Sequence, residues 1–484
     1  CLALVSQKFM ARRPCKITLP RHHKQQLQQA SSWMHFRATV PPSWWTRYMM
    51  LAPSIQRSLL TPVRLRIMRG VSLTRSMLLM DQWLKCTSRT LNRVSRGDTR
   101  ASLRPFRSEQ LRDSVSRVMC SACKQLRNTS TTTSKVIAAL NSQQLSKLPP
   151  LLVTGRLQRA LEIARDSCGV NALVVVSMDN IRWLTGFTGS TATLVVKDND
   201  SVLIVDGRYT QQAIDQLRLS DASARVVEAR TQALQMQQLS RELLGIKNCG
   251  FDSSEITMLN FETMVAQVAC SLIAANGVVQ QLRRIKTEAE TRRMQLAAHA
   301  TDLALADVQS MLEDAMSNQI SERDVRDELE YKMRRYGADG PSYETIVATG
   351  ENSVKPHHRP TDTIIREGDS VVIDVGGLVD GYHSDMTRTY LIGQVAPELA
   401  EIHDLVLCAQ REGVLAVRPG VSGSSIDEVC RSIIAEAGYG PDFIHGTGHG
   451  VGLQIHEMPW VRSDFMEPLQ CGEVVTVEPG VYRV

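Results

Sequence analysis

The feature that most constrains this chain is a 20-residue stretch in which carboxylates interrupt apolar, β-branched runs. Residues 371–390 read Val-Val-Ile-Asp-Val-Gly-Gly-Leu-Val-Asp-Gly-Tyr-His-Ser-Asp-Met-Thr-Arg-Thr-Tyr. β-branched and aromatic residues in short runs around a turn predict a strand, a turn and a second strand. Asp374 and Asp385 each fall inside such a run. A fold that buries these strands must therefore accommodate two carboxylates, because a buried charge is costly unless it is paired or ligated.

The turn sets how close the two carboxylates come. Asp380-Gly381 tolerates positive φ, so we expect a hairpin between residues 370–377 and 382–392. If Val379 pairs with Tyr382, Asp374 lies opposite Thr387 and diagonal to Asp385. If the pairing shifts by one residue, Asp374 and Asp385 lie directly opposite each other. In both registers they share a face of the sheet, because side chains alternate with period two.

Two carboxylates on one buried face repel each other, and one of them takes up a proton unless a cation is present. A divalent cation removes the conflict, since carboxylate oxygens suit Mn²⁺, Mg²⁺ or Ca²⁺ and an added His favours transition metals. The alternative is that one Asp caps a turn while the other pairs with Arg388.

Further metal ligands of the right kind follow near the end of the sequence. Residues 443–456 place His445, His449 and His456 among glycines, which let the backbone approach closely. No Lys-Ser/Thr follows these glycines and their spacing is not G-x-G-x-x-G, which excludes a phosphate loop. Residues 474–478 again put an acid, Glu478, at the end of a β-branched run. Three acids and a His in strand-like settings predict a dinuclear metal site.

The organisation of the chain also changes along its 484 residues, a length that predicts two or three domains. Residues 151–276 alternate helical and strand patterns, which predicts a small α/β domain. Residues 283–484 group helices before and between antiparallel strands, which predicts an α+β domain. Residues 277–286 are expected to be the linker. Thr287-Glu-Ala-Glu290 and Ser321-Glu-Arg-Asp324 each have the Ser/Thr-x-x-acid form that starts a helix.

The remaining element predictions come from local periodicity. Helices are expected from Arg156 to the stop at Gly169, and over 211–217, 233–245, 402–417 and 424–438, with the Ser321 helix stopping at Gly337. Strands are expected over 171–176, 193–196, 202–205, 343–348, 370–376, 382–392 and 474–477.

The first 150 residues differ from the rest in charge. They hold 26 basic and 4 acidic residues, so this segment carries +22 and residues 151–484 carry −16. We interpret residues 1–150 as a basic, disordered extension that contributes nothing to the chemistry. A targeting peptide or a nucleic-acid-binding arm are the alternatives, although no RNA-binding signature is present.

Composition argues against a membrane protein and against a protein built on disulfides. The longest apolar runs are shorter than the ~18 residues of a transmembrane helix, so no membrane association is expected. The 11 cysteines are odd in number and lack framework spacing, which favours a reducing compartment, and we expect a cytoplasmic protein. Cys120-x-x-Cys123 has no second pair, so we expect neither a metal nor a redox site there.

The motifs together resemble a known family. Ile-Asp374-x-Gly, Ser-Asp385-Met-Thr-Arg-Thr, Gly-Thr-Gly-His449-Gly-Val-Gly and Glu478-Pro-Gly resemble the pita-bread metallopeptidases of family M24, in their Xaa-Pro aminopeptidase/prolidase branch. Residues 180–190 and Val205-Asp-Gly-Arg-Tyr209 resemble the creatinase-type N-terminal domain of that branch. The resemblance implies an α+β fold with a C-terminal pita-bread catalytic domain, preceded by a smaller α/β creatinase-type domain.

The same resemblance implies roles for individual residues. Asp374 would chelate one metal, Asp385 would bridge both, and His449 and Glu478 would bind the other. The two divalent ions, with Mn²⁺ as first choice and Co²⁺ or Zn²⁺ as alternatives, would activate a shared water to attack a peptide carbonyl. His357 and His456 match two active-site histidines that contact the substrate, and His445 matches a supporting substrate-binding position. Glu478 would also accept the proton of the water, while His358 and Arg359 are expected to be wall or surface residues.

The family pattern includes one further bridging Glu beyond the Glu-Pro-Gly turn, and this sequence ends at Val484, before the strand that would carry it. We therefore expect a C-terminally incomplete catalytic domain with weakened occupancy of at least one metal position. The expected function is a metal-dependent Xaa-Pro aminopeptidase or Xaa-Pro dipeptidase acting on proline-containing peptides. The alternative is a peptide-binding pita-bread protein without catalysis. The resemblance also implies a homodimer, and nucleic acid is not an expected partner.

Overall fold

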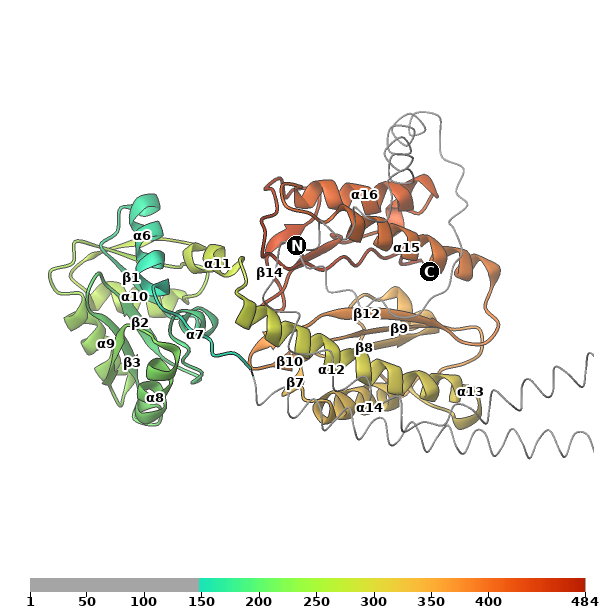
Figure 1. Ribbon diagram of the computed structural model, residues 1–484, viewed down its shortest axis with the longest axis horizontal. Coiled ribbons are helices and arrows are strands. Elements are labelled where there is room, and N and C mark those ends of the chain that lie inside the picture. Colours follow the sequence, from blue (N-terminus) through green and yellow to red (C-terminus); the bar gives the residue numbers. More distant parts are fainter. Residues whose placement is uncertain (1–147, 484) are drawn as a thin grey trace, which may run out of the picture. The chain divides into compact units, whose positions relative to one another are not determined.

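The computed structural model describes residues 148–483, and the first part of this range is a six-stranded sheet with helices (Figure 1). The strand order is β4-β3-β2-β1-β5-β6. The pairs β1/β2 and β2/β3 are antiparallel, and β3/β4, β1/β5 and β5/β6 are parallel. The strands are β1 (Ala172–Val175), β2 (Thr193–Val196), β3 (Ser201–Val205), β4 (Ala224–Glu228), β5 (Asn248–Phe251) and β6 (Ser271–Ala274). The helices are α6 (Arg156–Cys168), α7 (Met178–Thr185), α8 (Thr210–Ser220), α9 (Gln232–Glu242), α10 (Met258–Gln267) and α11 (Val278–Arg283).

Side chains of the central strands alternate between two hydrophobic clusters. In β1, Leu173 and Val175 join one cluster, while Ala172 and Val174 join the other. β3 divides in the same way, and all five of its residues are buried. Alternation with period two sends successive side chains to opposite faces, so this sheet is covered on both faces. That burial explains why these strands are continuous apolar runs in the sequence.

The second part, the α+β region, combines helices with three small sheets. Its helices are α12 (Glu288–Glu313), α13 (Ala315–Asn318), α14 (Glu322–Arg335), α15 (Pro397–Ala416) and α16 (Gly423–Glu436), with 3₁₀ turns at Gly350–Val354 and Gly440–Asp442. Its strands are β7 (Gly340–Pro341), β8 (Ile346–Thr349), β9 (Ser370–Val375), β10 (Gly377–Val379), β11 (Tyr382–His383), β12 (Met386–Leu391), β13 (Gly448–Gly450) and β14 (Glu457–Val461). They form small sheets of order β11-β10-β7, β12-β9-β8 and β13-β14. Figure 1 shows α12 and α14 along one side of β8, β9 and β12, with α15 and α16 on the other.

The hairpin forms in the first of the two registers that the sequence allowed. Val379 pairs with Tyr382, and Thr387 pairs with Asp374. Asp380 and Gly381 have φ of 45° and 73°, as the turn requires. The alternative register, with the two carboxylates directly opposite, is therefore wrong.

The two predicted helix starts are confirmed. The hydroxyls of Thr287 and Ser321 accept hydrogen bonds from the backbone N–H groups of Glu290 and Asp324, and both acidic side chains accept from the N-cap backbone in return. This reciprocal pairing satisfies donors that a helix start leaves free. α14 ends at Arg335, two residues before the predicted stop at Gly337.

Several local predictions are wrong. Residues 277–286 are not a plain linker, because they contain α11. Residues 474–477 form only a single bridge, Gly450 to Val475, rather than a regular strand. The second hairpin strand is divided into β11 and β12, and α15 starts five residues earlier than expected, at Pro397. Apart from residues 148–150, the predicted extension and the Cys120/Cys123 pair lie outside the described residues.

The end of α11 and the segment after it are fixed to the α+β region by buried ion pairs. Glu457 of β14 accepts from Arg283 at 2.6 Å and from Lys286 at 2.7 Å, and all three side chains are at most 5 % exposed. Arg284 donates to Glu473 at 2.6 Å, and these two side chains are 3 % and 1 % exposed. Since unpaired buried charges are costly, each partner holds the other in place.

Replacing Glu457 by Gln should therefore destabilise the protein, by about 3 kcal/mol at pH 7, because Arg283 and Lys286 would lose their buried counter-ion. Burial by itself would raise the pKa of Glu457, but the charges of Lys286 and Arg283 outweigh it and lower that pKa. The stabilisation is then fully present above the unfolded pKa of about 4.3 and is lost as pH falls through the folded value. Urea unfolding of wild type and variant between pH 7 and pH 3 measures both effects.

The matched control is Glu467→Gln, since Glu467 pairs with Arg284 but its side chain is 61 % exposed. A solvent-exposed ion pair contributes about 0–1 kcal/mol. Equal losses of stability in Glu457→Gln and Glu467→Gln would contradict the proposed importance of the buried pairs.

Candidate metal centre and substrate cleft

The two hairpin carboxylates meet at one tyrosine. Asp374 lies in β9, and Asp385 immediately precedes β12. The hydroxyl of Tyr343 donates to Asp374 Oδ1 at 2.5 Å and to Asp385 Oδ1 at 2.9 Å. Tyr343 could not be predicted from the sequence, because no local spacing connects it to residues 31 and 42 positions away. One hydroxyl shared by two acids shows that their oxygens face a common space.

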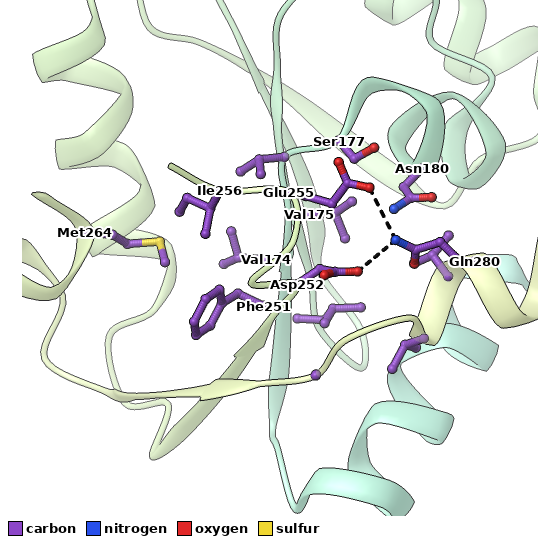
Figure 2. A pocket seen from close by; sticks show the side chains of 15 residues that line it. Val174, Val175, Ser177, Asn180, Phe251, Asp252, Glu255, Ile256, Met264 and Gln280 are labelled. Atoms are coloured by element: carbon purple, nitrogen blue, oxygen red, sulfur yellow. Dashed lines mark hydrogen bonds between the residues drawn. The ribbon is translucent and has the colours of Figure 1, made fainter. Parts of the chain in front are cut away.

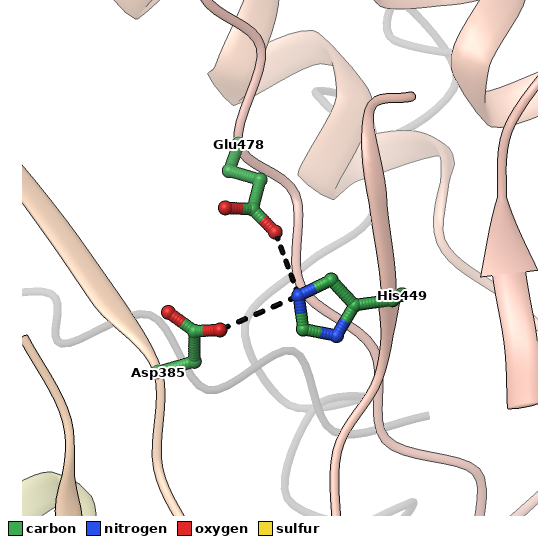
Figure 3. A group of neighbouring side chains, drawn as sticks. All are labelled: Asp385, His449 and Glu478. Carbon is green, nitrogen blue, oxygen red and sulfur yellow. Dashed lines mark ion pairs between the residues drawn. The ribbon is translucent and has the colours of Figure 1, made fainter. Parts of the chain in front are cut away.

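A histidine and a third acid complete this cluster (Figure 3). His449 Nε2 lies 3.4 Å from Asp385 Oδ2 and 3.2 Å from Glu478 Oε1. One potential ligand atom from each of Asp385, His449 and Glu478 lies within 4.8 Å of the others. Asp374 is not part of this trio but joins it through Tyr343 and Asp385. The structure thus brings together the four residues that the sequence analysis named as metal ligands.

Backbone pairing brings Glu478 close to His449 without a regular strand. Thr476 N donates to His449 O at 2.8 Å, and Glu478 N donates to Thr447 O at 2.7 Å. The two segments approach so closely at Gly448 that a Cβ there would lie 2.2 Å from the carbonyl oxygen of Thr476. Only glycine fits this approach. Thr476 Oγ1 also donates to Glu478 Oε1 at 2.7 Å, which orients the carboxylate.

The electrostatics of the cluster show how crowded the charges are. Burial and the neighbouring Asp385 raise the pKa of Asp374 to about 7. Burial alone would lower the pKa of His449, but its contacts with Asp385 and Glu478 outweigh that effect and raise it to about 10. Burial, together with the charges of Asp385 and Asp374, also raises the pKa of Tyr343 well above its usual value. All three shifts have one cause, which is that acids converge where solvent is scarce.

This donor set fits a divalent cation. Three carboxylates and one imidazole offer hard oxygens with a single nitrogen, a combination that suits Mn²⁺, Co²⁺ or Zn²⁺. The raised pKa values of Asp374 and His449 indicate that the cluster attracts positive charge. The residues present therefore fit the group that the sequence predicted.

The predicted substrate histidines line the same cleft as the acidic cluster. His357, His445 and His456 all contribute to its wall. The ring of His456 packs edge-on against that of His449, with centroids 4.4 Å apart. His445 Nδ1 lies 2.7 Å from Gly446 O, and its Nε2 lies 3.1 Å from the Tyr482 hydroxyl. His357 is exposed and has no side-chain hydrogen bond recorded within residues 148–483.

The two residues that follow His357 differ from each other. His358 is buried, and its Nε2 lies 2.8 Å from Glu322 Oε2. Arg359 is exposed and pairs with Glu344 at 3.0 Å. His358 and Arg359 both border the cleft, in keeping with their predicted place as wall or surface residues.

A second, smaller pocket lies beyond the carboxyl ends of β1 and β5 (Figure 2). Gln280 crosses it, donating to Asp252 at 2.8 Å and to Glu255 at 3.3 Å. Its volume of about 20 Å³ is enough for a water molecule but not for a peptide. Within residues 148–483, the cleft with the acidic cluster is therefore the better candidate site.

Comparison with known proteins gives the family. Residues 292–484 match the model of metallopeptidase family M24, and residues 156–285 match the creatinase/prolidase N-terminal domain. An Xaa-Pro dipeptidase from Pyrococcus horikoshii is 31 % identical over 317 residues, which cover 66 % of this chain and 87 % of that protein. The chain belongs to metallopeptidase family M24, with the creatinase-type domain in front of the pita-bread domain.

Solved structures give the same assignment. An Xaa-Pro dipeptidase from Bacillus anthracis superimposes with a TM-score of 0.63 and 32 % identity, covering 68 % of this chain and 91 % of that one. An X-Pro aminopeptidase from Thermotoga maritima gives a TM-score of 0.59 and 31 % identity, covering 66 % and 90 %. The predicted fold class is therefore confirmed.

As for membranes, no helix between residues 148 and 483 has the length and apolar character that a span requires.

Replacing Asp385 by Asn should weaken the binding of Co²⁺ or Mn²⁺ by more than about tenfold, because a ligand at the centre of the cluster is lost. Isothermal titration calorimetry of the purified chain measures this affinity. The control is Glu344→Gln, a carboxylate that lines the same cleft but pairs with Arg359 and lies outside the cluster. Unchanged affinity in Asp385→Asn would contradict the metal centre.

Proposed function

We propose that this protein is a metal-dependent exopeptidase that hydrolyses the bond between an amino-acid residue and a following proline. The observation that carries the proposal is the convergence of Asp374, Asp385, His449 and Glu478 in a cleft that three further histidines also line. Relatives named Xaa-Pro dipeptidase and X-Pro aminopeptidase support the substrate class.

We propose two divalent ions, preferably Mn²⁺, held by Asp374, Asp385, His449 and Glu478. When bound, these ions would supply Lewis-acid activation of water and of the peptide carbonyl. Asp385 lies between Asp374, with which it shares the Tyr343 hydroxyl, and His449, so it would hold the ions together with both of these residues. In this role Tyr343 orients the ligands by donating to both aspartates.

The chain's own groups then handle the substrate and the protons. As the oxygen of water forms its bond to the scissile carbonyl carbon, Glu478 accepts one proton of that water. When the C–N bond to proline then breaks, Glu478 gives this proton to the departing proline nitrogen. Burial and the charge on His449 lower the pKa of His456. In its neutral form His456 would donate an N–H to the developing oxyanion, and His357, which lines the same cleft, would donate to the substrate. His445, fixed by Gly446 and Tyr482, supports the same wall.

We further propose that the protein acts as a homodimer on proline-containing peptides and occupies the cytoplasm. The supporting argument for the substrate is the family of relatives named above. A reducing compartment agrees with the cysteines of the described region, since Cys168, Cys249, Cys270, Cys430 and Cys471 are free thiols.

The direct test supplies the purified chain with Mn²⁺ or Co²⁺ and compares an Xaa-Pro dipeptide, an Xaa-Pro tripeptide and matched Xaa-Ala peptides. We expect hydrolysis of the proline peptides only, and Asp385→Ala should abolish it. Cleavage of the dipeptide alone identifies a dipeptidase, and cleavage of the tripeptide identifies an aminopeptidase. Tight metal-dependent or metal-independent binding of the peptides without any hydrolysis would favour the peptide-binding alternative.

The substrate histidine gives a second test. His456→Gln should lower kcat by about 10²–10³-fold, because a donor to the developing oxyanion is removed. Binding of Co²⁺ should change little, since His456 is not one of the proposed ligands. His299→Gln is the matched control, because His299 is an exposed residue of α12. An unchanged kcat in His456→Gln would exclude the proposed role.

A further inference from the structure

We propose that Glu322 is a positioning residue whose buried carboxylate fixes the segment 349–361 and so presents His357 to the cleft. This inference rests on the proposed function, because it assigns His357 to substrate binding. It adds a residue that lies outside the cleft wall and outside the metal cluster.

The carboxylate comes from the first turn of α14. Ser321 caps this helix, and Glu322 is its first residue. A negative charge is favourable there, because the free N–H groups and the helix dipole give the N-terminus a positive potential. Glu322 is nevertheless 0 % exposed, so solvent does not stabilise its charge. Other donors must therefore do so.

The donors to the Glu322 carboxylate all come from the segment 349–361, and they lie at both ends of that segment. Oε1 accepts from Thr349 N at 2.9 Å and from Asn352 Nδ2 at 3.0 Å. Oε2 accepts from Thr361 N at 2.9 Å and from Thr361 Oγ1 at 2.8 Å, and His358 Nε2 lies 2.8 Å away. One oxygen thus holds the start of the segment and the other holds its end.

The ionised state of Glu322 follows from this arrangement. Burial would raise its pKa, but His358 and the backbone N–H groups of Thr349 and Thr361 outweigh burial and lower it. Among the ion pairs of residues 148–483, the partner recorded for Glu322 is His358, with no Lys or Arg beside it. The carboxylate is therefore stabilised by the very segment that it holds together.

The arrangement matters for His357, because its own side chain forms no hydrogen bond with other residues of 148–483 that would hold it in place. Its neighbour His358 is turned into the protein toward Glu322, while His357 lines the cleft. The metal cluster draws on other segments, namely β9, the residue before β12, β13 and residue 478. Loss of Glu322 should therefore disturb substrate binding and leave the metal ligands in place.

The test compares Glu322→Gln with Glu242→Gln. Glu242 is also a buried glutamate, at 8 % exposure, and it pairs with Lys197 and Arg225 at the edge of the six-stranded sheet. In Glu322→Gln the amide NH₂ faces donors, so we expect at least a tenfold rise in KM for an Xaa-Pro peptide. We also expect at least tenfold faster hydrogen exchange in residues 349–361, with Co²⁺ affinity within threefold of wild type.

Glu242→Gln should leave KM, exchange of residues 349–361 and Co²⁺ affinity within threefold of wild type. If Glu322→Gln does not fold, Thr361→Val replaces it, since this substitution keeps the size of the side chain and removes one donor to Glu322. For Thr361→Val we expect roughly a threefold rise in KM and faster exchange in the same segment.

The inference is overturned by unchanged exchange in residues 349–361, by an unchanged KM, or by a loss of Co²⁺ affinity parallel to the rise in KM. Hydrogen exchange does not depend on activity. If wild type hydrolyses no Xaa-Pro peptide, the proposed function fails, and the exchange measurement alone decides whether Glu322 fixes the segment.

Discussion

The repulsion between carboxylates in a poorly solvated cleft is the constraint around which the α+β region is organised. Asp374, Asp385 and Glu478 reach this place from three separate segments, and His449 and Tyr343 lie between them. Such an arrangement is stable only if protons, donors or cations offset the negative charge. The raised pKa values of Asp374 and His449 reflect this need for positive charge. Membership of the family supports a metal centre as the source of that charge.

Buried acids outside the cluster give the cleft its shape. Glu457, paired with Arg283 and Lys286, lies next to His456 at the start of β14. Glu322 gathers the segment that carries His357. In each case a charge that solvent does not reach is balanced by groups distant in the sequence. Each of these acids is linked to a histidine that we propose for substrate binding, since His456 precedes Glu457 and His357 precedes His358, whose Nε2 lies 2.8 Å from Glu322.

The parts that the sequence predicted correctly are local. The turn at Asp380-Gly381 and the two helix caps at Thr287 and Ser321 were read from a few adjacent residues, and all three formed as expected. Where a segment depends on its neighbours, prediction was poorer. Residues 474–477 have the composition of a strand, but among the described residues they form only one bridge, from Val475 to Gly450. Residues 277–286 contain a helix and three cations, Arg283, Arg284 and Lys286, whose acidic partners lie more than 150 positions away.

The sequence by itself singled out Asp374, Asp385, His449 and Glu478 as candidate metal ligands, because carboxylates inside apolar strands and histidines among glycines are local patterns and their motifs resemble those of one family. It also narrowed the hairpin to two registers, since side-chain direction follows from strand geometry alone. Only the tertiary structure decided between those registers and placed Tyr343 across both aspartates. It alone showed that the buried carboxylate of Glu322 contacts the segment that carries His357. These contacts join residues far apart in the chain, and their distances depend on how whole elements pack.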